Sequence, residues 1–246
     1  MATPSPSRPG RPKPPPPTLV LLVRHGTTPT TGKVLPGRAP GLHLSDAGRD
    51  QAEAVAGRLQ GWASAGSSAP RRRSGARGKA GGLAAPTSAV SAVYASPLER
   101  TRETAAPIAK TFGQRVSINR GLLECDFGEW TGMELKALSR RPEWTTVQRY
   151  PSGFRFPGGE SFTAMQARIV DTVATLVSRH RGGTVVVVSH ADPIKAVVAD
   201  ALGTHLDLFQ RIVVSPCSVT AISYSPTGPT VLAVNSTGSL SDLKPS

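Results

Sequence analysis

The sequence predicts an α/β fold, a three-layer αβα sandwich with a mostly parallel central sheet. Short continuous apolar runs, which are typical of strands buried on both faces, occur at Thr18–Val23 and Thr184–Ser189. Stretches with helical spacing of apolar residues separate the candidate strands, so strands and helices alternate along the chain. Without two segments of biased composition, 1–17 and 61–90, about 200 residues remain, which is enough for one well-buried core.

The two biased segments carry most of the net charge. Residues 1–17 contain eight of the 23 prolines, and residues 61–90 consist mostly of Gly, Ala, Ser, Pro and Arg. Eight Lys or Arg residues and no acidic residue lie in these segments, against a net charge of +13 for the chain. We predict a disordered Pro-rich tail, a low-complexity basic insertion and a second tail at 236–246. The remaining core is weakly basic, which disfavours nucleic acid as a partner.

The composition gives no sign of a membrane segment or a metal site. The apolar runs Leu19–Val23 and Val185–Val188 are too short to span a bilayer, and the first residues lack the apolar core of a signal peptide. Cys125 and Cys217 are far apart, and no CxxC pair indicates a thiolate zinc site. We expect a cytoplasmic protein with no membrane partner, no metal and no other cofactor.

The first half of the chain contains three candidate strands. Thr18–Val23 is the first, and Ser45 is then expected to cap a helix with apolar residues at helical spacing. Val90–Tyr94 is the second strand, and Ser96-Pro97 is expected to start the next helix with Pro at its first position. Arg115–Ile118 is the third, short strand.

The second half adds a long helix, a buried strand and a hairpin. The segment Pro157–Ser161 is expected to open a long amphipathic helix, and the strand Thr184–Ser189 follows it. Residues 194–202 have helical spacing again. Val219–Tyr224 and Pro229–Val234 are expected to form a closing hairpin.

Side chains that can take part in catalysis follow the ends of the candidate strands. His25 and His190 come directly after the two strongest strand candidates, and ligands of such sheets bind beyond the carboxyl ends of the strands. Arg24 lies at the first strand end, Arg100 in the helix after Ser96 and Glu124 in the loop after the third strand. Guanidinium groups bind phosphate oxygens, a neutral imidazole attacks phosphorus near pH 7, and a carboxyl group can protonate a departing alcohol. The set indicates phosphoryl transfer through a phosphohistidine.

Six blocks stand out in order along residues 18–235, namely LVRHGTT, LSDAGRDQA, YASPLERTRETA, LLECDFGEWTG, FPGGESF and VVVVSHADPIKAV. They resemble the histidine phosphatase superfamily, the phosphoglycerate mutase-like proteins. The later segments HLDLFQRIVVSPCSVTAISY and VNSTG are most similar to actinobacterial members described as phosphoglycerate mutase-like or putative phosphomutase proteins. The resemblance implies a phosphoglycerate mutase-like fold and one catalytic domain over 18–235.

The resemblance also implies a role for each candidate site residue. His25 matches the phosphorylated histidine, and Arg24 and Arg100 match the phosphate-binding arginines. His190 matches the second histidine, which donates to the phosphoryl group. Glu124 matches the acid that protonates the leaving group and then serves as the base for water. Further phosphate or substrate contacts are implied for Gly26, Thr28, Thr31, Gly37 and Ala191.

Three activities remain open at this point. The first is a phosphomonoester hydrolase of the histidine acid phosphatase type, acting on a small phosphorylated metabolite. The second is a bisphosphate-dependent phosphoglycerate mutase, which Thr27, Thr31 and Ala191 disfavour because they depart from common family residues. The third is a regulatory module that binds phospho-ligands or polyanions through residues 61–90, which the intact catalytic set disfavours. A homodimer is also left open.

Several charged residues have competing interpretations. Glu129 and Asp126 are alternatives to Glu124 for the acid, and Glu160 is predicted to be a helix-start acid. A group of arginines could favour an acidic substrate. This group is Arg38, Arg140, Arg141, Arg149 and Arg155.

Overall fold

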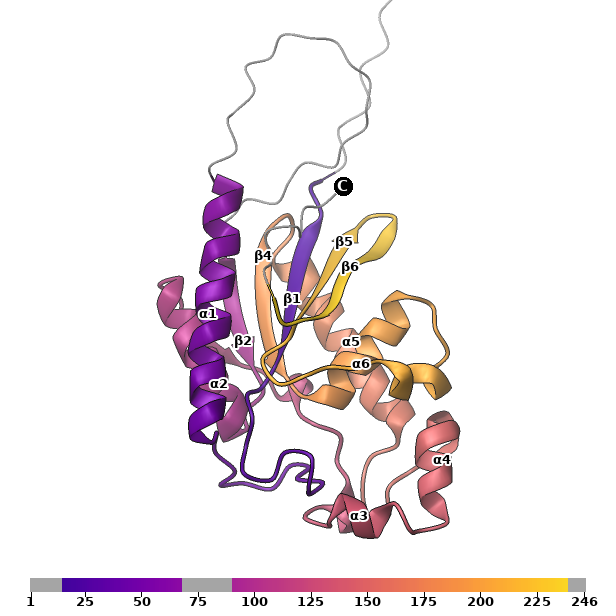
Figure 1. The fold of residues 1–246 in the computed structure, drawn as a ribbon. Helices are drawn as coiled ribbons and strands as arrows, with labels where there is room; N and C mark the ends of the chain where they lie inside the picture. The colour runs from indigo at the N-terminus through magenta and orange to yellow at the C-terminus, as the bar shows by residue number, and fades with distance from the viewer. Residues whose placement is uncertain (1–14, 68–89, 239–246) are drawn as a thin grey trace, which may run out of the picture.

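A computed structural model describes residues 15–67 and 90–238 of the chain (Figure 1). The predictions for most of the N-terminal tail, for residues 68–89 of the insertion and for residues 239–246 therefore lie outside the described residues.

The described part is built on one six-stranded sheet with the order β3-β2-β4-β1-β5-β6. Four strands run parallel, namely β1 (Thr18–Arg24), β2 (Val90–Ala95), β3 (Val116–Ile118) and β4 (Thr184–Ser189). The predicted hairpin forms the other edge as β5 (Val219–Ser225) and β6 (Gly228–Ser236), with β5 antiparallel to β1. The predicted α/β class with a mostly parallel sheet is confirmed.

Helices cover both faces of this sheet (Figure 1). One face carries α1 (Asp46–Ser67) and α2 (Glu99–Thr111), and the other carries α5 (Phe162–Arg179) and α6 (Ala191–Ala201). Two short helices, α3 (Leu135–Leu138) and α4 (Glu143–Arg149), lie in the connection between β3 and α5. None of the described helices is long and apolar enough to cross a membrane.

Strand β1 lies inside the sheet and is buried on both faces, which explains its apolar sequence. Leu19, Leu21 and Val23 pack into the core cluster of α1 and α2. Val20 and Leu22 pack into the cluster of α5 and α6. Successive side chains of a strand point to opposite faces, so a strand covered on both sides needs apolar residues at every position.

Two helix boundaries differ from the sequence prediction. Helix α1 begins after Ser45, whose Oγ accepts from the backbone N–H of Gly48 at 3.1 Å as predicted, but it continues through residues 61–67. Trp62 packs against the core cluster on this face, which extends the helix into the segment predicted to be irregular. Helix α2 begins at Glu99 instead of Pro97, because Leu98 has an extended backbone with ψ of 145° and so caps the helix.

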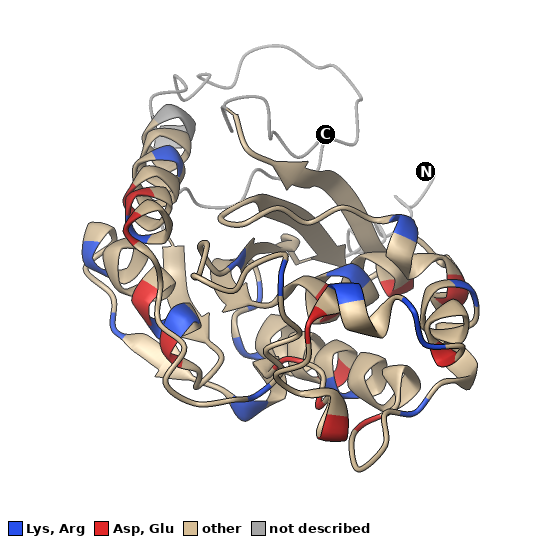
Figure 2. Ribbon diagram, turned by 60° about the horizontal axis from the view of Figure 1, so that its bottom comes forward, with Lys and Arg blue, Asp and Glu red and all other residues tan. Residues whose placement is uncertain are grey.

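Figure 2 shows that acidic and basic residues are interspersed along the described ribbon. Residues of both signs of charge therefore occur in many of the described helices and loops.

Candidate active site

A cleft of about 380 Å³ lies beyond the carboxyl ends of β1 and β4. Six of the candidate residues predicted from the sequence line it, namely Arg24, His25, Thr28, Thr31, Glu124 and Ala191. Arg100 and His190 do not line it and are fully buried behind it. The parallel sheet explains this convergence, because adjacent parallel strands end at the same edge.

His25 is held with one ring nitrogen free. Its Nδ1 lies 2.7 Å from the Gly26 carbonyl oxygen, which can only accept, so Nδ1 carries the hydrogen and Nε2 keeps its lone pair. Burial, followed by the charges of Arg100 and Arg24, lowers the pKa of His25 to about 3. The imidazole is therefore neutral near pH 7 and able to act as a nucleophile.

His190 faces His25 with a ring-centroid distance of 5.3 Å and an edge-on arrangement. Its Nε2 lies 2.9 Å from the Ser96 hydroxyl, while its Nδ1 is buried with no partner among the described residues. When Ser96 donates to Nε2, the ring hydrogen is at Nδ1, ready for an acceptor that enters the site. Ser96 was predicted only as a helix start, and no sequence signal pointed to this contact.

The two arginines keep unused donors. Arg24 donates from Nη1 to the Val214 carbonyl at 2.7 Å, and its Nε has no partner among the described residues. Arg100 donates from Nη2 to the Gly37 carbonyl at 2.8 Å, and its Nε and Nη1 have none. Burial lowers the pKa of both guanidinium groups below its ordinary value, and the charge of Glu124 counteracts this. Because buried guanidinium groups require compensation, the arrangement is suited to a bound oxyanion.

Gly26 and Gly37 do not line the cleft, and their predicted contact with phosphate or substrate stays a prediction. A Cβ on Gly26 would lie 2.5 Å from the Gly48 carbonyl oxygen, so the missing side chain lets this turn approach α1. Gly37 has a φ of +51° and presents its carbonyl to Arg100. Both glycines shape the surroundings of the cleft.

Thr28 and Thr31 line the cleft and also bind each other. The Thr31 hydroxyl accepts from the Thr28 backbone N–H at 2.8 Å, and the two hydroxyl oxygens lie 2.9 Å apart. These contacts fix the loop that follows His25.

Glu124 is the carboxyl group of the cleft. Its Oε1 accepts from the backbone N–H of Cys125 at 2.9 Å. Burial, followed by the charge of Asp192, raises its pKa to about 7, so a large share of the carboxyl is protonated near neutral pH. Of the alternative acids, Glu129 is exposed and Asp126 pairs with Arg38, and neither lines the cleft.

The loop that carries Glu124 is fixed by two arginines joined through Glu160. The Glu160 carboxylate pairs with Arg38 and with Arg168, each at 2.9 Å. Arg38 donates to the Glu124 carbonyl at 2.8 Å, and Arg168 donates to the carbonyls of Gly121 and Leu123. The prediction of Glu160 as a helix-start acid is wrong, because Ser161 caps α5 and Glu160 bridges the arginines. No local sequence pattern indicates this network, because its members are far apart along the chain.

We expect Glu160→Gln to destabilise the protein by about 1–3 kcal/mol, because it leaves Arg38 and Arg168 without their counter-charge. Urea unfolding with an unchanged slope would measure this loss of unfolding free energy. Glu129→Gln removes the same charge from an exposed position and serves as the control, with a change within about 0.5 kcal/mol. Equal effects of the two substitutions would contradict the proposed role of the bridge.

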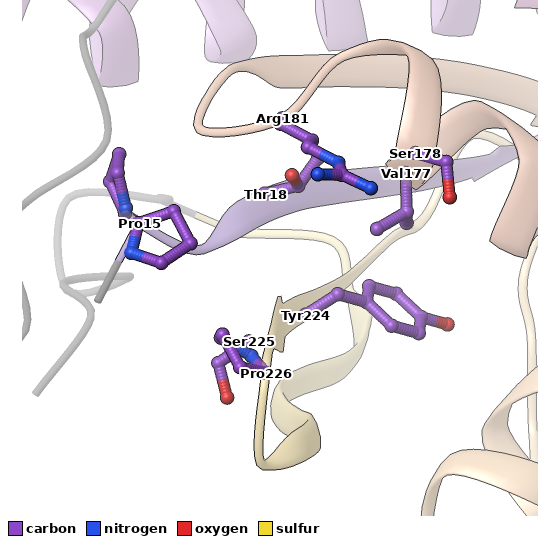
Figure 3. A pocket seen from close by; sticks show the side chains of 9 residues that line it. Pro15, Thr18, Val177, Ser178, Arg181, Tyr224, Ser225 and Pro226 are labelled. Carbon is purple, nitrogen blue, oxygen red and sulfur yellow. The ribbon is translucent and has the colours of Figure 1, made fainter.

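A separate hollow of about 350 Å³ lies at the amino end of β1. Figure 3 shows Thr18, Arg181 and Tyr224 around it. Pro15, which precedes β1, and Pro226, which follows β5, also line it. Of the described residues that line it, none is His, Cys, Asp or Glu. It therefore lacks the nucleophile and the acid that the cleft at the other end of β1 provides.

The sequence of this chain is similar to those of known proteins. A model of the histidine phosphatase superfamily (branch 1) matches residues 20–77 and 73–237. The bifunctional protein Rv2228c of Mycobacterium tuberculosis is 32% identical over 228 residues, which are 91% of this chain and 55% of that protein. The chain thus spans about half the length of this relative. The probable phosphoglycerate mutase GpmB of Klebsiella pneumoniae is 30% identical over 146 residues, 58% of this chain and 67% of that protein.

Solved structures share the fold. The native structure of the mycobacterial glucosyl-3-phosphoglycerate phosphatase Rv2419c superposes with a TM-score of 0.70 at 23% identity. The superposition covers 89% of this chain and 99% of the other. The superposition therefore shows that the two chains share a fold.

Proposed function

The chain belongs to the histidine phosphatase superfamily, and we propose that it is a phosphomonoester hydrolase that forms a phosphohistidine at His25. One observation carries the proposal. A neutral imidazole with its lone pair at Nε2 lies in the field of two buried arginines, Arg24 and Arg100, and their N–H groups without a partner among the described residues are available to an anion. The substrate is a small phosphorylated metabolite, with Thr28, Thr31 and Ala191 beside its phosphoryl group.

In the first step, His25 Nε2 attacks phosphorus and the ester P–O bond breaks. Arg24, Arg100 and the Nδ1–H of His190 bind the phosphoryl oxygens as charge develops on them. The protonated carboxyl of Glu124 gives its proton to the departing alkoxide. The products of this step are the alcohol, the phosphohistidine and the Glu124 carboxylate.

In the second step, the Glu124 carboxylate takes a proton from water while the water oxygen attacks phosphorus. The P–N bond breaks, and its electron pair returns to His25 Nε2. Inorganic phosphate leaves, and Glu124 is protonated again. The raised pKa of Glu124 suits both roles, because the group must lose and regain one proton in each cycle.

The stereochemistry at phosphorus tests this proposal. A phosphorothioate ester made chiral at phosphorus with ¹⁸O, hydrolysed in ¹⁷O-labelled water, should give chiral inorganic thiophosphate with retained configuration, because two in-line displacements each invert it. Inversion would indicate direct attack by water and would contradict the covalent intermediate.

The mutase is a second candidate, which the similarity to the probable phosphoglycerate mutase GpmB favours. The same residues serve both reactions, and the acceptor of the phosphoryl group decides between them. We expect free phosphate to form from phosphate esters, with little exchange between 2- and 3-phosphoglycerate when bisphosphoglycerate is supplied. Rapid exchange with little free phosphate would make the mutase the correct assignment.

We expect turnover to persist after exhaustive chelation. Arg24, Arg100 and His190 supply the positive charge and hydrogen bonds that divalent ions supply in many phosphoryl-transfer sites. Phosphate release after dialysis against a chelator should match that of untreated enzyme. A large loss that magnesium or manganese restores would contradict this expectation.

We expect kcat/KM for an alkyl phosphate to fall as the pH rises through about 7. Catalysis requires neutral His25, which prevails above its pKa of about 3, and protonated Glu124, which prevails below its pKa of about 7. Activity should therefore be highest between these two values. In Glu124→Gln the fall assigned to this carboxyl should be absent, and its persistence would assign it to another group.

A further inference from the structure

The cleft continues into a second chamber. This chamber has a volume of about 270 Å³ and lies beside the cleft, with which it shares part of its wall. The shared residues are Leu35, Phe127, Leu135, Asp192, Lys195 and Gln210. When a phosphoryl group is bound near His25, the group esterified to it would lie against this shared wall.

The chamber's own wall is mainly apolar. Trp144, Val147, Phe156 and Phe162 form it together with the polar Gln148. Val147, Phe156 and Phe162 belong to the core cluster, and Trp144 packs against that cluster while half-buried. Core packing therefore sets the positions of most of these side chains.

The charges at the shared wall compensate each other. Lys195 Nζ lies 3.2 Å from Asp192 Oδ1 and 3.0 Å from Gln210 Oε1, and both charged side chains are less than a fifth exposed. Among the described residues that line the chamber, no other is charged. The arginines predicted to favour an acidic substrate do not line it, since Arg38 binds Glu160 and Arg141 lies over Trp130.

We propose that this chamber binds the leaving group of the substrate and that the substrate is the phosphate ester of an uncharged, largely apolar alcohol of ring size. This inference rests on the proposed hydrolysis. An ionised carboxylate placed here would lose its water without gaining a free cation. An apolar cavity of roughly 150 Å³ already accepts benzene, so the larger chamber has room for a ring.

Matched esters test the class of leaving group. Benzyl phosphate, 3-phosphoglycerate and phosphoserine all release an alcohol, but only the first releases an uncharged apolar one. We expect kcat/KM to be at least about 10-fold higher for benzyl phosphate, within the range that apolar pockets provide. A preference for either charged ester would overturn this inference. It would leave the proposed function intact if 4-nitrophenyl phosphate still phosphorylated His25.

Two variants locate the preference in the chamber. Asp192→Asn keeps the size of the side chain but frees Lys195, so the ratio of kcat/KM for 3-phosphoglycerate to that for benzyl phosphate should rise about 10-fold. Because the ratio is taken within one variant, the effect of Asp192 on Glu124 largely cancels. An unchanged ratio would show that the Asp192–Lys195 pair does not exclude anions.

Trp144→Ala removes an aromatic wall and should raise KM for benzyl phosphate about 10-fold, while ethyl phosphate, which does not reach the chamber, is hydrolysed as before. Tyr150→Ala is the matched control, since this aromatic residue follows the same helix, is 58% exposed and lines neither cavity. Equal effects of the two aromatic substitutions on benzyl phosphate would overturn the assignment of the chamber.

Discussion

Replacing His25 with alanine should reduce turnover on every phosphate ester by about 10⁴-fold or more, because no second group can form the covalent intermediate. His190 is too constrained to substitute, since its Nε2 is bound to Ser96 and its ring is fully buried. Phosphate release from an aryl and an alkyl ester measures the loss. Far-ultraviolet circular dichroism and thermal unfolding check that the fold persists.

His205→Ala is the matched control for this prediction. Its side chain is 69% exposed, pairs with Asp207 and does not line the cleft. This variant should retain turnover. Substantial turnover in His25→Ala would show that water attacks phosphorus directly or that another nucleophile is used.

Glu124→Gln should slow hydrolysis of an alkyl phosphate by roughly 10²–10⁴-fold, the usual contribution of a general acid. The substitution keeps the size and hydrogen bonding of the side chain but removes the proton that the alkoxide needs. A nitrophenolate leaves without that help, so the first step on 4-nitrophenyl phosphate should be nearly unaffected. A burst of nitrophenol should appear, because loss of the base slows dephosphorylation.

Rapid-mixing kinetics on the two ester types separate these effects. Glu129→Gln is the control, because this carboxyl group is exposed and does not line the cleft. Equal losses on the first step for alkyl and aryl esters would show that Glu124 is not the acid for the leaving group.

The sequence predicts the local features of this protein well. The apolar runs of β1 and β4 identify buried strands, and both histidines follow directly from their strand ends. Ser45 has the expected capping contact. Patterns of this kind depend on residues close together in the chain, so one sequence is sufficient to read them.

The remaining features depend on contacts between distant segments. Ser96 reaches His190 across 94 positions of the chain, and Arg38 reaches Glu160 across 122. Pro97 satisfies the local rule for a helix start, but Leu98 after it has an extended backbone, and the helix starts at Glu99. The leaving-group chamber likewise requires α4, α6 and the loop near Leu35 to meet, which no local pattern encodes.

The residue that carries the phosphoryl group decides whether the reaction proceeds through a phosphohistidine. Enzyme mixed with a labelled aryl phosphate and quenched in alkali should carry a phosphoryl group that is stable to base and labile to acid. Peptide mapping should place it on His25, and His25→Ala should carry none. A label on serine or aspartate, or the same label in His25→Ala, would contradict the proposed phosphohistidine.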